Sequence, residues 1–379
     1  MSSKAGYAGP KVKSDILVEF TQNDSILSLS GFTAEQEQAI LETAERLEIT
    51  KGIVSGEDSG AAPWVAAARF EAAVRSELGE MFLPLPSAAR WTVQPKDRPR
   101  RSRLYAPGNK PRFIEKAAAA GADGIILDLE DSVAPDRKDE ARILVAYALA
   151  NTDFGNAEVM VRINQGDRAA DDLNWIVPQP VQHILLPKVE LAEDVAAIRD
   201  MVETVMDLCG RDSFPWLMPI LESPRGILNA LSIADSVPEM AALTLGLQDL
   251  TAEIGIMPTP EATESFTARS LVVLAARAAD LQPIDTVYAD VKNAEGLLKS
   301  IKEAKILGFV GKGCIHPSQV KLVEEGFMPS EAQIDKARKI VAAMEEAKKK
   351  GLGAIALGSK MIDPPVARQA LAVLKLIGE

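Results

Sequence analysis

Two acidic residues, Glu222 and Asp249, follow two consecutive short apolar runs of the sequence. Two carboxylates that point into one pocket repel each other unless a cation lies between them. Mg²⁺ accepts a few carboxylates and keeps several waters that substrate oxygens can replace. The pair therefore indicates a magnesium site, and the alternative is that each acid pairs with a neighbouring Lys or Arg.

Arg162 ends another apolar run, and its guanidinium fork is suited to bidentate binding of a carboxylate. The alternative is an ion pair with Asp128 or Glu130, which form an acidic cluster with Asp131. We expect some of these acids to orient water or to support Arg162 instead of binding metal directly.

His316 follows the last apolar run, in the string CysIleHisPro. It is a candidate catalytic base, but we favour a structural histidine that bonds the backbone of its loop. The string GAIALGSK (353–360) is similar to a phosphate-binding loop with its last two residues inverted. No buried strand precedes it, so we discount a nucleotide site there.

The composition limits the possible partners and metals. Asp and Glu number 54 against 42 Lys and Arg, a formal net charge of -12, which argues against nucleic acid and against a polybasic membrane anchor. Only two histidines and two cysteines occur, so neither a three-His zinc site nor a CxxC site is expected. Without an apolar run of ~18 residues or a secretory leader, we expect a cytoplasmic protein with no membrane span.

Short apolar runs alternate with helical patterns after residue 101, and they predict the elements that position these residues. Near-continuous apolar strands are typical of parallel sheets, and eight βα units fit a (β/α)8 TIM barrel. A doubly wound sheet is the alternative, although no GxGxxG follows a strand. The candidate residues fall at the C-terminal strand ends, where barrels carry their active sites. The runs are 103–106, 124–129, 159–163, 183–189, 216–221, 243–247, 285–289 and 309–315.

The whole chain divides into four parts. Residues 1–82 have the pattern of a small α+β domain, and residues 83–101, rich in Pro and Arg, that of a linker. Residues 102–350 comprise the predicted barrel, and residues 351–379 a C-terminal lid segment and helix. The elements expected in the small domain are a strand at 16–20 and helices that begin at Thr33 and over 61–78.

Several strings occur together and in order after residue 101, and they carry a family resemblance. The chain resembles the citrate lyase beta chain family, which is related to the HpcH/HpaI aldolases and to the malyl-CoA and citramalyl-CoA lyases. The resemblance implies a TIM barrel, usually trimeric, and Mg²⁺-dependent cleavage or formation of a C–C bond beta to a thioester. The strings are RSRLYAPGNKPRFIEKA, GADGIILDLEDSVAPDRKDEAR, VMVRIN, ILLPKVE, LESPRGILNA, GLQDLTAEIG, GFVGKGCIHPSQV and GSKMIDPPV.

Site residues carry over from this resemblance by position. Glu222 and Asp249 resemble the magnesium ligands, and Arg162, with Glu130 beside it, resembles the arginine that holds the keto-acid carboxylate. Asp363 resembles a lid aspartate that a neighbouring subunit contributes. One departure is GlyLeuGlnAsp, in which Gln248 stands where relatives often have an acid. The resemblance maps contacts to the thioester carrier onto the segments of Asn109, Arg112 and Lys138.

The first 82 residues resemble the citrate lyase gamma chain, an acyl carrier protein. In that family a serine near the N-terminus carries a phosphoribosyl-dephospho-CoA arm, and Ser14 is the candidate here. Lys13 departs from the pattern, because relatives have serine at the first position of this step. An unmodified remnant of the carrier is therefore the alternative.

These resemblances imply a Mg²⁺-dependent lyase that cleaves a 3-hydroxy-3-carboxyacyl thioester, of the citryl type, into a keto acid and an acetyl thioester. One alternative is a malyl-CoA or citramalyl-CoA lyase that acts on free CoA esters and has a structural N-terminal domain. Another is a non-catalytic carrier or assembly subunit. We expect a homo-oligomer, and a citrate lyase would also need an acyltransferase subunit.

Overall fold

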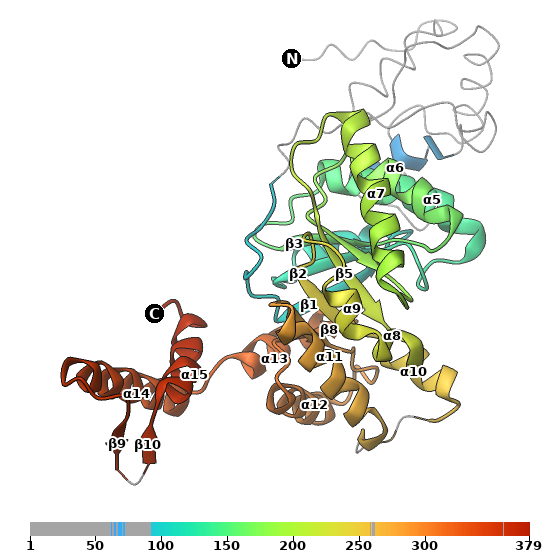
Figure 1. Cartoon of the computed structure of the whole chain (residues 1–379). Coiled ribbons are helices and arrows are strands. Elements are labelled where there is room, and N and C mark those ends of the chain that lie inside the picture. Colours follow the sequence, from blue (N-terminus) through green and yellow to red (C-terminus); the bar gives the residue numbers. More distant parts are fainter. Residues whose placement is uncertain are drawn as a thin grey trace, which may run out of the picture.

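Eight parallel strands close into a barrel in the order of the chain, which confirms the predicted TIM-barrel fold (Figure 1). The computed structural model describes residues 62, 64, 65, 67–69, 71, 72 and 92–379, apart from 258, 260, 261 and 359. The strands are β1 (Ser102–Pro107), β2 (Gly124–Asp128), β3 (Glu158–Arg162), β4 (His183–Leu186), β5 (Trp216–Leu221), β6 (Ala242–Leu245), β7 (Gln282–Asp285) and β8 (Gly311–Cys314).

The prediction for the seventh strand was wrong in its position. It placed the strand at 285–289, whereas β7 ends at Asp285. Pro283 weakens the strand pattern because it has no N–H, yet its carbonyl accepts a hydrogen bond from the Val310 N–H at 3.0 Å. Val287 lies beyond the strand and lines a cavity at the barrel mouth, which explains an apolar residue there.

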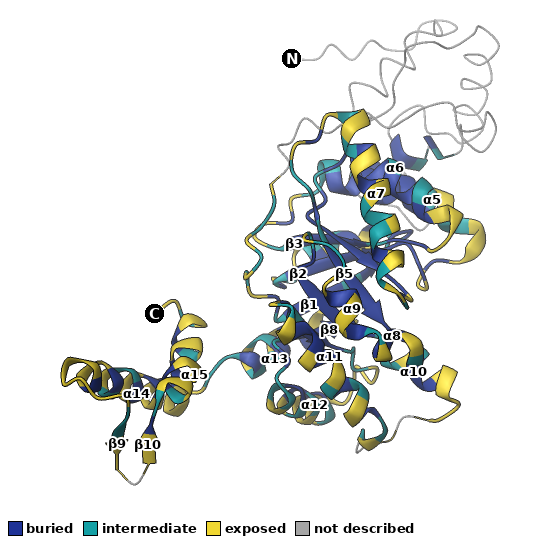
Figure 2. Cartoon of the chain, in the orientation of Figure 1, coloured by how far each residue is buried: buried dark blue, intermediate teal, exposed yellow. Residues whose placement is uncertain are grey.

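The strands are buried on both faces, as Figure 2 shows by their colour. Every residue of β2 and β4 is buried, in agreement with their near-continuous apolar sequences. The inward-facing side chains fill the barrel, and the outward-facing ones pack beneath the helices. The interior cluster comprises Ile126, Met160, Leu185, Met218, Ile220, Ala242 and Ile284.

Helices follow the strands and cover the outside of the barrel, with their exposed faces outward (Figure 2). Gly210, Gly255 and Gly308 end three of them in the left-handed conformation that favours glycine. No helix in the described part of the chain is both long and apolar enough to cross a bilayer. The helices are α4 (Pro111–Ala118), η3 (Pro135–Arg137), α5 (Lys138–Asn151), α6 (Asp167–Ile176), α7 (Ala192–Cys209), α8 (Pro224–Leu228), α9 (Ala230–Ala234), α10 (Leu247–Ile254), η4 (Thr263–Ser265), α11 (Phe266–Ala278), α12 (Ala294–Leu307) and α13 (Pro317–Phe327).

The end of the chain forms a unit with its own apolar core. It contains α14 (Glu331–Lys349), the antiparallel strands β9 (Ile355–Leu357) and β10 (Lys360–Ile362), and α15 (Pro364–Lys375). Figure 1 shows this unit projecting from the barrel after α13. Its core is separate from that of the barrel and is built from Ile334, Ala337, Ile340, Met344, Ala347, Ile362, Ala367, Ala370 and Leu374.

A short N-terminal segment packs against the outside of the barrel. Its described residues between Trp64 and Ala72 are helical, in agreement with the helix predicted over 61–78. Trp64 is buried in the main core, and Glu71 accepts a hydrogen bond from the Tyr147 hydroxyl of α5 at 2.6 Å. Ser14, the strand at 16–20 and the helix at Thr33 lie outside the described residues.

Candidate active site

The C-terminal strand ends surround two cavities, of about 1230 Å³ and about 330 Å³. Glu222 follows β5, and Asp249 lies in the first turn of α10, which follows β6. Both side chains line both cavities. The structure therefore brings together the two acids that the sequence singled out.

Glu222 is held in a fixed position. Only 4% of the residue is exposed, and its Oε1 accepts a hydrogen bond from the Lys188 N–H at 2.7 Å. Gly246 packs so closely that a Cβ at this position would collide with Glu222 Oε2. The glycine therefore makes room for the carboxylate.

The electrostatics of Glu222 fit a cation. Burial raises the pKa of Glu222 to about 8, and the nearby Asp249 and Glu130 carboxylates add to this. Glu222 forms no ion pair within the described part of the chain. A positive ion beside it would remove this penalty.

Asp249 is the more accessible of the two acids, with 43% of its side chain exposed. Its nearest cation is Lys188, whose Nζ lies 3.8 Å from Oδ1. Among the described residues, no group of three or more His, Cys, Asp or Glu side chains is placed to hold a metal. A Mg²⁺ ion held by these two carboxylates would take its remaining ligands from water and substrate, as this ion commonly does.

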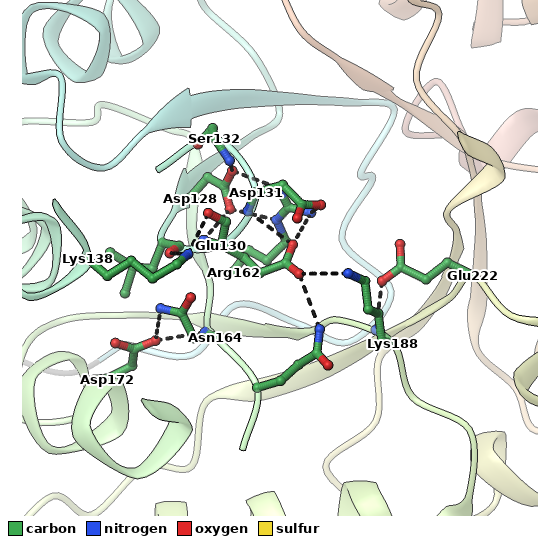
Figure 3. Close-up of polar contacts among 12 residues, drawn as sticks. Asp128, Glu130, Asp131, Ser132, Lys138, Arg162, Asn164, Asp172, Lys188 and Glu222 are labelled. Carbon is green, nitrogen blue, oxygen red and sulfur yellow. Dashed lines mark hydrogen bonds and ion pairs between the residues drawn. The ribbon is translucent and has the colours of Figure 1, made fainter. Parts of the chain in front are cut away.

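Arg162 is engaged by acids, as the alternative for this residue predicted. Its Nε and Nη2 donate to the two oxygens of Asp128 at 2.6 and 2.7 Å, and Nη1 lies 2.8 Å from Glu130 (Figure 3). Burial opposes its charge, but the bonds with Asp128 outweigh burial and raise the pKa of Arg162. The guanidinium carbon lies 5.4 Å from the centre of the Tyr105 ring. Arg162 is thus a rigid, ionised group at the barrel mouth.

Glu130 connects the arginine to the neighbouring strand. It is 6% exposed, and its carboxylate lies between Arg162 and Lys188, whose Nζ is 3.5 Å away (Figure 3). Burial raises the pKa of Glu130 above its usual value, and the nearby charge of Arg162 offsets only part of this rise. Gln165 also donates to Glu130 at 3.2 Å.

Lys188 has a structural role that the sequence did not reveal. It follows β4 with a φ of 51°, a left-handed conformation that is uncommon for a residue other than glycine. This conformation directs its N–H to Glu222, while its Nζ approaches Glu130 and Asp249. Its position at a strand end was the available signal, but the backbone angle is invisible in sequence.

The three residues mapped to the thioester carrier lie away from the two cavities. Lys138 holds the loop after β2, since its Nζ donates to the Leu129 and Glu130 carbonyls at 3.0 and 2.8 Å. Asn109 is 8% exposed, and its Oδ1 has no hydrogen-bond partner in the described structure. Arg112 is exposed on α4. None of the three lines a cavity with Glu222.

Asp363 and His316 both cap helices. Asp363 accepts a hydrogen bond from the Val366 N–H at 3.1 Å, in the C-terminal unit, and it lines neither cavity of its own chain. His316 Nδ1 accepts a hydrogen bond from the Ser318 N–H at 3.2 Å, the kind of backbone contact that the structural interpretation of this histidine predicted.

Comparison with known proteins agrees with this architecture. Residues 101–317 match the HpcH/HpaI aldolase/citrate lyase family. The citrate lyase subunit beta of Escherichia coli K12 is 37% identical over 284 residues, 74% of this chain and 94% of that protein. An L-malyl-CoA/beta-methylmalyl-CoA lyase of Cereibacter sphaeroides is 35% identical over 303 residues, 74% of this chain and 95% of that protein.

A solved structure is also similar. The protein CitE from Mycobacterium tuberculosis, in complex with magnesium, acetoacetate and coenzyme A, superposes with a TM-score of 0.62 at 30% identity. The similarity covers 75% of this chain and 100% of that chain. The chain therefore belongs to the HpcH/HpaI aldolase/citrate lyase family, and it is a lyase.

Proposed function

We propose that this lyase uses Mg²⁺ to cleave a 3-hydroxy-3-carboxyacyl thioester of the citryl type into a keto acid and an acetyl thioester. The observation that carries the proposal is the buried Glu222, which lines the same cavities as Asp249 and forms no ion pair in the described part of the chain. The citrate lyase beta relatives and the CoA complex that contains magnesium support it.

The reaction is a retro-Claisen cleavage. A base takes the proton of the 3-hydroxyl group, an electron pair of that oxygen forms the carbonyl of the keto acid, and the C2–C3 bond breaks. The electrons of this bond form the thioester enolate, which gains a proton to give the acetyl thioester. Negative charge therefore moves from the hydroxyl oxygen to the thioester oxygen.

The residues at the barrel mouth match the demands of this step. Glu222 and Asp249 would hold Mg²⁺, which supplies positive charge to stabilise the oxygens that become negative. Arg162, held by Asp128 and Glu130, presents a fixed guanidinium edge to the carboxylate of the keto acid.

The proton-transfer group in this proposal is Asp363 from a second copy of the chain. Within one chain Asp363 caps α15 and lies outside both cavities, which supports a contribution from the neighbouring copy of a homo-oligomer. The C-terminal unit, with a core of its own, would act as the lid. The segments of Asn109, Arg112 and Lys138 would contact the thioester carrier.

The thioester has two candidate carriers. In the first, Ser14 carries the acyl group on a phosphoribosyl-dephospho-CoA arm, and a tether of this kind raises the effective substrate concentration to the mM range. An acyltransferase partner would then load it. In the second, the substrate is a free CoA ester, as the malyl-CoA lyase relative suggests. Intact-mass measurement of protein from its native host separates the two, because the second predicts an unmodified Ser14.

A substrate panel tests the proposed reaction. Purified full-length protein is incubated with citryl-CoA, malyl-CoA and citramalyl-CoA, with Mg²⁺ or with EDTA, and keto-acid release is measured. We expect release from citryl-CoA that requires Mg²⁺ and that the Asp249→Asn variant loses. No Mg²⁺-dependent release by either the wild type or the variant would favour a non-catalytic carrier or assembly subunit. Activity restricted to malyl-CoA or citramalyl-CoA would favour that lyase class.

A further inference from the structure

A buried arginine in the barrel interior lacks a carboxylate partner. Arg103, on β1, is 1% exposed. Its Nη2 donates to Thr244 Oγ1 at 2.8 Å, and its Nη1 lies 2.7 Å from Met218 Sδ. Both partners are neutral, and Nε has no hydrogen-bond partner in the described structure. A guanidinium has five N–H donors, so Arg103 can donate further hydrogen bonds to a ligand.

Three other buried arginines of the barrel are paired with acids, and a fourth, Arg211, donates to four backbone carbonyls. Arg100 binds Glu158 at 2.6 Å, Arg142 binds Asp172 at 2.8 Å, and Arg269 binds Asp285 at 2.9 Å. Arg103 forms no ion pair within the described part of the chain, and burial lowers the pKa of Arg103 to about 10. A buried charge without a counter-ion is costly, and an anionic ligand would remove that cost.

Arg103 belongs to the floor of the candidate active site. It lines the cavity of about 330 Å³ together with Tyr105, Arg162, Glu222 and Asp249. A cavity of this size is at the lower end of the range for small-molecule sites, so it suits a small acid better than a long thioester arm. Arg162 is already balanced by two carboxylates, whereas Arg103 is balanced by none.

We propose that Arg103 binds the second carboxylate of the substrate, the one that Arg162 does not hold; after cleavage both carboxylates remain on the keto acid. The inference rests on the proposed function and selects its substrate class. A citryl thioester releases a keto acid with two carboxylates, whereas malyl and citramalyl thioesters release acids with one. Arg103 therefore makes this enzyme selective for thioesters that release a dicarboxylic 2-oxo acid.

The binding of two keto acids tests this assignment. Oxaloacetate, with two carboxylates, and pyruvate, with one, are titrated into the full-length protein with Mg²⁺ by calorimetry. We expect wild type to prefer oxaloacetate, and Arg103→Met to lose roughly 10-fold or more of its oxaloacetate affinity with pyruvate affinity nearly unchanged. Arg103→Lys, which keeps the charge, is expected to retain part of the preference.

Kinetics and a control separate binding from damage to the fold. For citryl-CoA we expect Arg103→Met to raise KM more than it lowers kcat. Arg277→Met removes an exposed arginine of α11 that lines neither cavity, and it should behave like wild type. Circular dichroism verifies that each variant is folded, and Arg103→Lys serves as the test if Arg103→Met does not fold.

The outcomes distinguish this inference from the proposed function. If a folded Arg103 variant loses affinity for oxaloacetate and pyruvate equally, or for neither, the proposed role of Arg103 is overturned. Mg²⁺-dependent cleavage by the wild type would still stand in that case. A wild-type protein that cleaves no thioester and binds neither acid overturns the proposed function, and the inference with it.

Discussion

The Lys188 backbone N–H donates a hydrogen bond to Glu222 Oε1 at 2.7 Å, and Lys188 adopts a φ of 51° in doing so. The strained turn after β4 thus fixes a carboxylate that belongs to the end of β5. Backbone strain of this kind persists only where the surrounding structure enforces it, and it is common at functional sites. The relationship supports Glu222 as a positioned ligand and not a chance buried acid.

Replacement of Glu222 by Gln should separate metal binding from stability. The amide keeps the shape of the side chain and cannot ionise, so the metal-free variant never buries a charge at this position and should be as stable as wild type or more stable. Mg²⁺ should raise the Tm of wild type but not of the variant, and the apparent Mg²⁺ affinity should fall at least about 10-fold. Differential scanning calorimetry without Mg²⁺ and at several Mg²⁺ concentrations measures the metal-free stability, the shift in Tm and the apparent affinity.

The control for this variant is Glu303→Gln, at a partly exposed acid of α12 that lines neither cavity. It should keep the full response to Mg²⁺. A Glu222→Gln protein that Mg²⁺ stabilises as strongly as wild type would remove Glu222 from the metal site.

Gly246→Ala should impair the same site by steric means. The added Cβ would collide with Glu222 Oε2 and would also lie 2.6 Å from Glu222 Cβ. We expect a loss of about 1–3 kcal/mol in the free energy of unfolding and a weaker response to Mg²⁺. Gly353→Ala is the matched control, because a Cβ there meets no atom within 4 Å. Urea unfolding with and without Mg²⁺ compares the unfolding free energies of the two variants. Equal losses and equal responses to Mg²⁺ would contradict the steric argument.

The strand pattern predicts most of the fold because parallel strands buried on both faces are continuous in apolar character. The pattern fails at β7, where Pro283 interrupts it and the apolar Val287 lies beyond the strand end. Rules about single residues cannot distinguish an apolar residue in a strand from one that lines a cavity.

The site was predictable to the extent that it depends on strand ends. Glu222 and Asp249 were found because carboxylates follow consecutive apolar runs, but Arg103 was missed and the role of Lys188 was not predicted. Arg103 lies on the same face of β1 as Tyr105, and a charged residue at an inward-facing strand position is a usable signal. The partners of Arg162 remained open because distances between strands cannot be read from sequence.

Mixing of two inactive variants tests whether Asp363 acts across subunits. Asp363→Asn and Asp249→Asn should each be inactive alone. If each active site combines Asp249 of one copy with Asp363 of another, random reassembly of an equal mixture leaves about a quarter of the sites intact. Keto-acid release from citryl-CoA should therefore recover to about that fraction of wild type. No recovery in a mixture shown to have exchanged subunits would place Asp363 outside the neighbouring site.

The buried ion pair below the active site should make stability depend on pH. Arg100 donates Nε to Glu158 Oε2 at 2.6 Å and Nη2 to Oε1 at 2.7 Å, and both side chains are fully buried. Burial raises the pKa of Glu158, but His183 and Arg100 outweigh burial and lower it from 4.5 to about 2. Because the folded-state pKa is depressed, this stabilisation is complete above pH 4.5 and is lost as the pH falls through about 2.

Glu158→Gln measures this contribution. The amide leaves Arg100 buried without its counter-ion, so the variant should lose about 3–5 kcal/mol of unfolding free energy near neutral pH. The difference from wild type should shrink as the pH falls from 4.5 toward 2, because protonation of Glu158 removes the same charge from wild type. Urea unfolding at several pH values follows this difference, with the exposed Glu346→Gln as control. A difference that stays constant across this pH range would show that the ionised carboxylate is not what stabilises the barrel at this position.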